Sequence, residues 1–373
     1  MKILIVDDSA LVRGILKQLL LEQSDMVIIG EASNGQSGYE KNLELLPDII
    51  IMDINMPVMD GLEATKKIMA ERPVPILIFS SSIEAGSSFE AISAGAVDLM
   101  RKPDIDQLNE PEFVAVFIDK LKNLHRQTAQ YGDHAGEPAA AAAARAAGPE
   151  PAAAANSASS TAAGVAGAAG SLKKPAVHDK DSPVIVIGAS TGGPLAVREV
   201  LKDLPPTFSA GIAVVQHLEE GFDTGYTGWL NESTSLNVML AGTQPQPFLP
   251  GNVTVAPVNL HLIVAEGKLT LDDGPKILNQ KPAVDALFST AAEWYGDRVI
   301  GVLLTGMGRD GAEGCRKIIA QGGHTLVQNR ETSAIFGMPK AAIDLGAASE
   351  VVSLADIPKR LMEIVTEKEG STV

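Results

Sequence analysis

Cysteine is almost absent from the sequence, since Cys315 is the only one in 373 residues. A lone thiol cannot form an internal disulfide and lacks partners for a metal cluster, so we interpret Cys315 as a small packed residue in a reducing environment. Long hydrophobic runs are also missing, and Asp7 and Asp8 interrupt the short apolar stretch near the amino terminus. We therefore expect no signal peptide and no membrane insertion, and predict a cytoplasmic protein.

Basic charge is scarce as well. Lysine and arginine total 30 against 46 aspartates and glutamates, which gives a formal net charge of −16. A nucleic-acid-binding surface needs clustered cations, and the sequence contains neither a basic helix nor zinc-finger spacing. We expect no nucleic-acid partner. A hydrophobic content of 45% and this length predict well-buried cores in more than one domain.

Large apolar residues almost disappear from the middle of the chain. Residues 125–182 consist mainly of Ala, Gly, Pro and Ser, with alanine runs at 139–144 and 152–155. Such a segment cannot bury enough surface to offset the entropy of ordering, and prolines interrupt the alanine runs. We predict a flexible, disordered linker between two folded domains.

A candidate nucleophile follows this linker. The apolar run Val184–Ile187 leads into Gly188-Ala-Ser-Thr-Gly192, a G-x-S-x-G pattern in which Ser190 occupies a tight strand-to-helix turn. The same stretch nearly matches the dinucleotide fingerprint G-x-G-x-x-G, but Ser190 stands where backbone must approach a pyrophosphate. The pattern also arises by chance at tight turns, so a catalytic reading requires a base and an acid.

The candidate base is His217, which directly follows the short apolar run Gly211–Gln216 and so lies at the carboxyl end of an expected strand. The remaining histidines lie in polar sequence or beside apolar runs and are interpreted as structural or solvated: His125, His134, His178, His261 and His324.

The candidate acid is Asp310, which follows the apolar run Val299–Leu304 and a glycine-rich stretch. Asp297 precedes that run and would lie at the opposite edge of a sheet, while Asp272 and Asp273 lie in a turn-like Asp-Asp-Gly-Pro.

Sites in open parallel sheets form beyond the carboxyl ends of the strands. Ser190, His217 and Asp310 are each expected at such an end, so they are predicted to form a catalytic triad. Glycines around Met307 would let backbone N–H groups stabilise an oxyanion. The order Ser, His, Asp differs from that of α/β-hydrolases, so membership of that fold is not inferred.

The amino-terminal third carries a second candidate site. Asp7 and Asp8 end one apolar run, Asp53 ends another and Ser80 ends a third. Clustered carboxylates repel unless a cation lies among them, and an oxygen-rich site with open positions suits Mg²⁺. Lys102 could neutralise a further charge. As an alternative, Asp7 or Asp8 could cap a helix that starts near residue 10.

Five short motifs lie in the carboxyl-terminal half: Ile187–Gly193, Gln216-His217, Leu304–Gly311, Gln328-Asn329 and Phe336–Pro339. Through these motifs, residues 183–365 resemble the catalytic domain of chemotaxis protein-glutamate methylesterases of the CheB type. The family implies that Ser190, His217 and Asp310 form the triad, with Thr191 and Met307 beside it. Two segments depart from the family pattern: Leu218-Glu-Glu-Gly221 replaces Met-Pro-Pro-Gly, and Lys281-Pro-Ala-Val-Asp285 replaces Arg-Pro-Ser-Val-Asp.

Residues 1–124 resemble a response-regulator receiver domain, through Met52–Gly61 and Lys102-Pro103. The resemblance implies that Asp53 accepts phosphate from a histidine kinase while Asp7 and Asp8 help to bind Mg²⁺. It also implies that Ser80 and Lys102 sense the phosphoryl group. Leu99 stands where receivers often carry an aromatic switch residue.

Together these patterns predict an α/β protein with two doubly wound parallel-sheet domains: a flavodoxin-like receiver (1–124) and a Rossmann-like methylesterase (183–373). The family resemblance implies hydrolysis of glutamate methyl esters on chemoreceptors, with release of methanol, and also deamidation of receptor glutamines. No cofactor is expected for the hydrolase. The alternative to this enzymatic activity is a phospho-dependent signalling scaffold without turnover. The unphosphorylated receiver is predicted to dock beside Ser190 and to obstruct large protein substrates.

Overall fold

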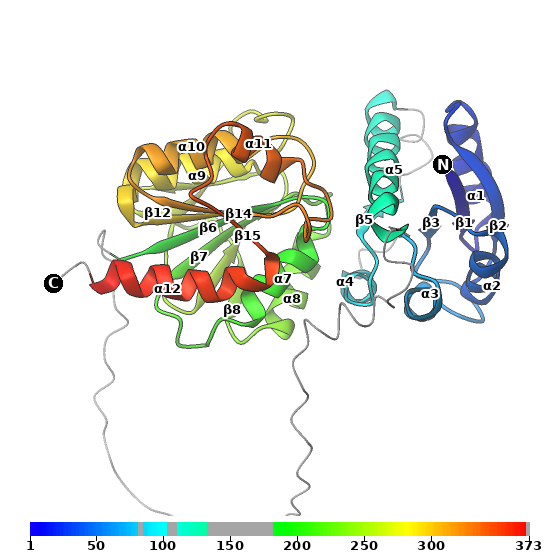
Figure 1. The fold of residues 1–373 in the computed structure, drawn as a ribbon, viewed down its shortest axis with the longest axis horizontal. Coiled ribbons are helices and arrows are strands. Elements are labelled where there is room, and N and C mark those ends of the chain that lie inside the picture. Colours follow the sequence, from blue (N-terminus) through cyan, green and yellow to red (C-terminus); the bar gives the residue numbers. More distant parts are fainter. Residues whose placement is uncertain (81–84, 103–109, 133–181, 371–373) are drawn as a thin grey trace, which may run out of the picture.

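A computed structural model describes residues 1–80, 85–102, 110–132 and 182–370. They form two α/β domains, each built around a parallel sheet (Figure 1). The predicted flexible linker began at residue 125, but residues 125–132 are helical and belong to α5 (Pro111–Gly132), so this boundary is wrong. Residues 133–181 of the expected linker, and Pro103, lie outside the described residues, and that part of the linker stays a prediction. Within the described residues, no helix combines the length and apolar character needed to span a bilayer.

The amino-terminal sheet has the strand order β2-β1-β3-β4-β5, with every pair parallel. This is the flavodoxin-like order, as predicted. Strands β3 and β4 are buried along their whole length, because helices cover both faces. The strands are β1 (Lys2–Val6), β2 (Val27–Ala32), β3 (Ile49–Met52), β4 (Ile76–Ser80) and β5 (Asp98–Arg101).

Polar caps define where the first helices of this domain begin. The side chain of Ser9 accepts a hydrogen bond from the Val12 N–H at the start of α1, and Asn34 and Asp60 cap α2 and α3 in the same way. Because Ser9 is the cap of α1, Asp7 and Asp8 are not needed for that role. The helices are α1 (Ala10–Leu21), α2 (Gly35–Leu45), α3 (Gly61–Glu71), α4 (Ala85–Ser93) and α5 (Pro111–Gly132).

The second sheet has the order β15-β14-β13-β6-β7-β10-β8, again with every pair parallel. The chain winds from β6 to one side and later returns through β13 on the other, so the prediction of a doubly wound sheet is confirmed. The switch point where ligand sites form therefore lies between β6 and β13. The strands are β6 (Val184–Ala189), β7 (Gly211–Gln216), β8 (Asn237–Leu240), β10 (Asn252–Val255), β13 (Val299–Leu303), β14 (His324–Gln328) and β15 (Glu350–Val352).

Two groups of helices cover the faces of this sheet. Helices α9, α10 and α11 lie on one face, whereas α7, α8 and α12 lie on the other (Figure 1). The helices are α7 (Gly193–Lys202), α8 (Asp223–Ser233), α9 (Val284–Tyr295), η2 (Gly296–Arg298), α10 (Ala312–Ala320), α11 (Met338–Asp344), η3 (Leu354–Asp356) and α12 (Ile357–Gly370).

A small antiparallel sheet was not foreseen. Residues 253–264 alternate in the sequence as a single strand would, but the structure divides them between β10 and β11 (His261–Ala265). Strand β11 pairs with β12 (Lys268–Asp272), which pairs with β9 (Gln246–Pro247). Alternation shows that residues share a face, but it does not show where a strand leaves its sheet.

The receiver and the second domain meet through α4 and α8. Phe89 of α4 is fully buried and stacks on Trp229 with ring centroids 5.5 Å apart, and it also contacts Phe222 and Tyr226. The indole N–H of Trp229 donates to the Ser93 hydroxyl at 3.2 Å. Helices α4 and α5 face the second domain, while α1 and α2 lie on the far side of the receiver (Figure 1).

Candidate active site

Ser190 lies directly after β6, at the turn into α7. Its N–H donates to the Thr305 carbonyl at 3.0 Å, which ties the turn to the end of β13. Gly192 has a φ of 74°, and a side chain there would meet Ala334. A Cβ at Gly193 would lie 2.1 Å from the Gln216 side chain. The glycines of the motif therefore allow the turn that presents Ser190 at the sheet edge.

His217 is held against this turn from the neighbouring strand. Its backbone N–H donates to the Ala189 carbonyl at 3.0 Å, and the Gln216 amide donates to the Ser190 carbonyl at 2.8 Å. The imidazole Nε2 lies 2.8 Å from Asp310 Oδ2, while the buried Nδ1 has no hydrogen-bond partner. A proton on Nε2 would leave Nδ1 as the acceptor for a hydroxyl proton. The hydrogen bond between a catalytic serine and its histidine often tightens only when substrate binds.

Asp310 is buried and held by backbone amides. Besides His217, it accepts hydrogen bonds from the N–H groups of Val284 (2.8 Å) and Asp285 (2.9 Å), at the amino terminus of α9. The positive end of a helix favours an anion there. Asp285 ends the Lys281–Asp285 motif that departs from the family pattern, and nothing in the sequence predicted its place in the site.

The residues expected beside the triad lie close to Ser190. The Thr191 carbonyl accepts from the Thr305 hydroxyl at 3.0 Å. A Cβ at Gly306 would lie 2.8 Å from Ser190 Cβ, so the loop carrying Met307 passes directly against the serine. The Met307 side chain is 41% exposed, and its sulfur contacts the Asn123 amide of α5.

Two of the other histidines have structural surroundings. His261 is buried, accepts from the Ala283 N–H and lies 3.0 Å from the Pro275 carbonyl oxygen. His324 lies 2.8 Å from a carboxylate oxygen of Glu350. Both agree with their interpretation as structural residues.

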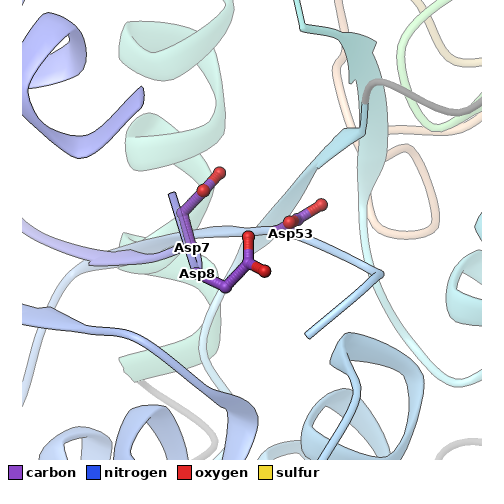
Figure 2. Close-up of side chains that lie close together, drawn as sticks. All are labelled: Asp7, Asp8 and Asp53. Carbon is purple, nitrogen blue, oxygen red and sulfur yellow. The ribbon is translucent and has the colours of Figure 1, made fainter. Parts of the chain in front are cut away.

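The predicted receiver site gathers three carboxylates at the ends of β1 and β3 (Figure 2). One oxygen from each of Asp7, Asp8 and Asp53 lies within 4.8 Å of the others. The Lys102 ammonium is 2.7 Å from Asp7 and 2.8 Å from Asp53. Burial raises the pKa of Asp53 even though Lys102 opposes the shift. Oxygen donors alone, with Asp8 exposed, fit a hard cation such as Mg²⁺.

The two other residues that the receiver resemblance singled out, Ser80 and Leu99, lie on β4 and β5. Ser80 is buried at the end of β4, where its carbonyl accepts the Lys102 N–H at 2.9 Å. Leu99 is buried in β5, and its carbonyl accepts from the Lys120 ammonium.

The loop after His217 reaches the receiver. Glu219 accepts a hydrogen bond from the Arg101 N–H at 2.9 Å, one residue before Lys102. Burial raises the pKa of Glu219, while Lys120 opposes the shift. Lys120 also pairs with Asp98 at 3.1 Å. The sequence marked Glu219 as a departure from the family but did not predict this contact.

Comparison with known proteins agrees with both resemblances. The CheB methylesterase family model matches residues 185–361, and the response regulator receiver domain model matches residues 3–111. A protein-glutamate methylesterase/protein-glutamine glutaminase of Anaeromyxobacter dehalogenans is 37% identical over 364 residues, covering 97% of this chain and 96% of that protein. The Thermotoga maritima protein of the same name is 35% identical and covers 98% of both chains.

Solved structures match the two domains separately. The Thermotoga maritima CheB methylesterase catalytic domain is 39% identical with a TM-score of 0.46, covering 49% of this chain and 98% of that chain. The response regulator domain of the same organism's CheB is 36% identical with a TM-score of 0.32, covering 34% and 96%. On the full-length similarity, the chain belongs to the family of protein-glutamate methylesterases/protein-glutamine glutaminases with an amino-terminal receiver domain.

Proposed function

We propose that this protein hydrolyses glutamate methyl esters on chemotaxis receptors, releases methanol and also deamidates receptor glutamines, under the control of its receiver. The observation that carries this proposal is the His217–Asp310 contact of 2.8 Å, with the second imidazole nitrogen unengaged beside the Ser190 turn. This arrangement suits acyl transfer, and the family supplies the substrate class.

The triad residues divide the reaction between them. Ser190 Oγ attacks the ester carbonyl and gives its proton to His217 Nδ1, while Asp310 orients the ring and stabilises the imidazolium. Backbone N–H groups near Met307 and Thr191 bind the oxyanion. His217 then gives the proton to the departing ester oxygen as its bond to the acyl carbon breaks, which releases methanol, or to the departing amide nitrogen of a glutamine, which releases ammonia. Water repeats the cycle on the acyl-enzyme.

In the receiver, Asp53 accepts a phosphoryl group from a histidine kinase. Asp7, Asp8 and Asp53 would hold Mg²⁺, which offsets negative charge on the phosphoryl oxygens. Ser80 and Lys102 contact the phosphoryl group, and Lys102 gives up part of its present pairing with Asp7 and Asp53.

The unphosphorylated receiver obstructs the catalytic site. Support comes from Phe89 against α8, Asn123 against Met307, and Arg101 against the loop that follows His217. Lys102 adjoins Arg101, so a change at the phosphorylation site can loosen the contact with Glu219. A coupling of about 1–3 kcal/mol between phosphorylation and docking is sufficient for regulation.

Methanol release from a purified methylated receptor tests the activity. We expect turnover by the purified protein, none by Ser190→Ala, and labelling of the wild type by a serine-directed probe. A phospho-dependent scaffold would bind receptor without methanol release. Absence of turnover in a folded protein labelled by the probe would contradict the substrate assignment while keeping Ser190 as a nucleophile.

A further inference from the structure

Two aspartates cap each other's helices beside the catalytic histidine. Asp310 accepts from the N–H groups of Val284 and Asp285 at the start of α9. In return, one oxygen of Asp285 accepts from the N–H groups of Gly311 (3.0 Å) and Gly314 (2.7 Å) at the start of α10. Neither helix has a capping side chain at its own N-cap residue, so each cap comes from the other helix.

The negative charge of Asp285 carries a cost. Burial raises its pKa to about 6, the two glycine N–H groups oppose this shift, and Asp310 and Glu313 add to it. Burial raises the pKa of the nearby Cys315 thiol, and the negative charge of Asp285 adds to that shift. Neutral Asn or Ser caps a helix about as well as Asp. A charge that disfavours folding near neutral pH, at a position where a neutral cap would serve, indicates a role beyond capping.

We propose that Asp285 is a positioning residue for ester hydrolysis, which fixes the peptide after Asp310 and thereby aligns the imidazole of His217. Gly311 follows Asp310 directly and has a φ of 89°. A side chain there would meet Val284 at 2.7 Å, so the two helix starts are in close contact. Releasing the Gly311 N–H would let the Asp310 peptide turn. The inference rests on the proposed function, because it assigns Asp310 to the triad.

The negative charge has a second effect on the same reaction. His217 becomes positively charged when it takes the serine proton, and its Nε2 contacts Asp310. Asp285 adds negative potential behind Asp310, where it favours the imidazolium. A pure helix cap would not alter how readily His217 takes up a proton.

The test compares Asp285→Asn and Asp285→Ser with Glu313→Gln in the full chain. Glu313 lies in the first turn of the same helix and pairs with Arg316, but it is exposed. Its replacement therefore removes one nearby charge and leaves the hold of Asp285 on Gly311 and Gly314 intact. Two cap variants are included so that one folded variant is sufficient, with near-ultraviolet circular dichroism as the check.

Kinetics and a probe of Ser190 give the decisive readings. For the Asp285 variants we expect kcat to fall about 10- to 100-fold with KM nearly unchanged, as for a displaced catalytic group. The acid limb of the rate of Ser190 labelling by a serine-directed probe should move to lower pH, because His217 loses negative potential. Glu313→Gln should keep the wild-type kcat and labelling profile.

Two outcomes would overturn the inference. One is an Asp285 variant with wild-type kcat and an unmoved acid limb, since the residue would then be only a cap. The second is an equal loss in Glu313→Gln, which would assign the effect to any nearby charge. A further outcome, a fall in kcat with an unmoved acid limb, would overturn the electrostatic effect on His217 and keep Asp285 as the residue that positions Asp310. Failure of the proposed function looks different, because the wild type itself would then lack turnover or probe labelling.

Discussion

The two domains each place a buried aspartate beyond the carboxyl ends of parallel strands, yet these two carboxylates have opposite surroundings. Asp53 lies among other carboxylates, with the Lys102 ammonium as its counter-charge. Asp310 accepts two backbone N–H groups from a helix start and contacts His217. One aspartate is crowded by like charge, whereas the other is held by fixed dipoles.

This difference matches the work proposed for each residue. A phosphoryl acceptor must present an oxygen that can change partners, and the Lys102 contact can be exchanged for a cation and a phosphoryl group. An orienting aspartate must keep one geometry through every turnover, and rigid amides maintain it. The same side chain is therefore made reactive or immobile by its neighbours.

The largest expected effect is at the serine and its base. Ser190→Ala and His217→Ala should each lower kcat by roughly 10⁴- to 10⁶-fold, because the two residues act as one unit. Methanol release measures the loss, and circular dichroism checks folding. Near-normal turnover by a folded Ser190→Ala variant would end the proposed mechanism.

The matching change in the receiver should remove phosphorylation. Asp53→Asn cannot form an acyl phosphate, so label from a small phosphodonor should disappear, as it should when a chelator removes Mg²⁺. Asp60→Asn is the control, since Asp60 caps α3 outside the carboxylate cluster. Label that persists in Asp53→Asn would place the acceptor elsewhere.

Replacing the orienting aspartate should lower kcat less than replacing the nucleophile does. Asp310→Asn keeps Ser190 and His217 but places an NH₂ group where a carboxylate now accepts, so kcat should fall by about 10³- to 10⁴-fold. Asp297→Asn, at the opposite end of β13 and 70% exposed, should stay near wild type. Equal losses in Asp310→Asn and Ser190→Ala would show that Asp310 does more than orient the ring.

The catalytic triad and Asp285 differ in how far the sequence could reveal them. Ser190, His217 and Asp310 could be proposed because each follows an apolar run, and parallel strands bring such ends together. Asp285 could not, because it acts across two helix starts that only the fold brings together. The sequence likewise predicted two doubly wound parallel sheets. It did not predict the small antiparallel sheet, which depends on where the chain leaves the main sheet after β10.

The interface between the domains shows the same limit. The composition of residues 125–182 predicted two separate domains, but it carried no information on which surfaces meet. Nothing in the sequence distinguishes Phe89, Tyr226 and Trp229 from other apolar residues, yet they are buried against one another across the domains. A buried aromatic residue in a sequence does not reveal which core it joins.

A smaller effect is expected from loosening this interface. Phe89→Ala should raise the activity of the unphosphorylated protein on receptors by about 5- to 150-fold, the range of typical allosteric coupling. Leu11→Ala, exposed on α1 at the far side of the receiver, is the control. A fragment starting at Ser182 and the phosphorylated full-length protein should reach similar rates. Equal rates for all forms would exclude obstruction and leave recruitment to the kinase as the role of the receiver.

The smallest effect concerns stability. Replacing aspartate by asparagine should lower the stability of the folded protein at Asp310 and raise it at Asp53. Asp310→Asn loses charge-assisted hydrogen bonds to α9 and should destabilise the protein by about 1–2 kcal/mol. Asp53→Asn should instead raise the melting temperature in chelator, because burial raises the pKa of Asp53 and the ionised form therefore disfavours folding.

The dependence on pH identifies the cause of this contrast. Since the folded protein holds the Asp53 proton more tightly than the unfolded chain, wild-type stability should gain as pH falls through the raised pKa. The advantage of Asp53→Asn should shrink over the same range. Calorimetry at a series of pH values in chelator measures both. A melting temperature lowered by Asp53→Asn would mean that pairing with Lys102 outweighs the cost of burial. Both ionised aspartates would then stabilise the fold, although their chemical roles differ.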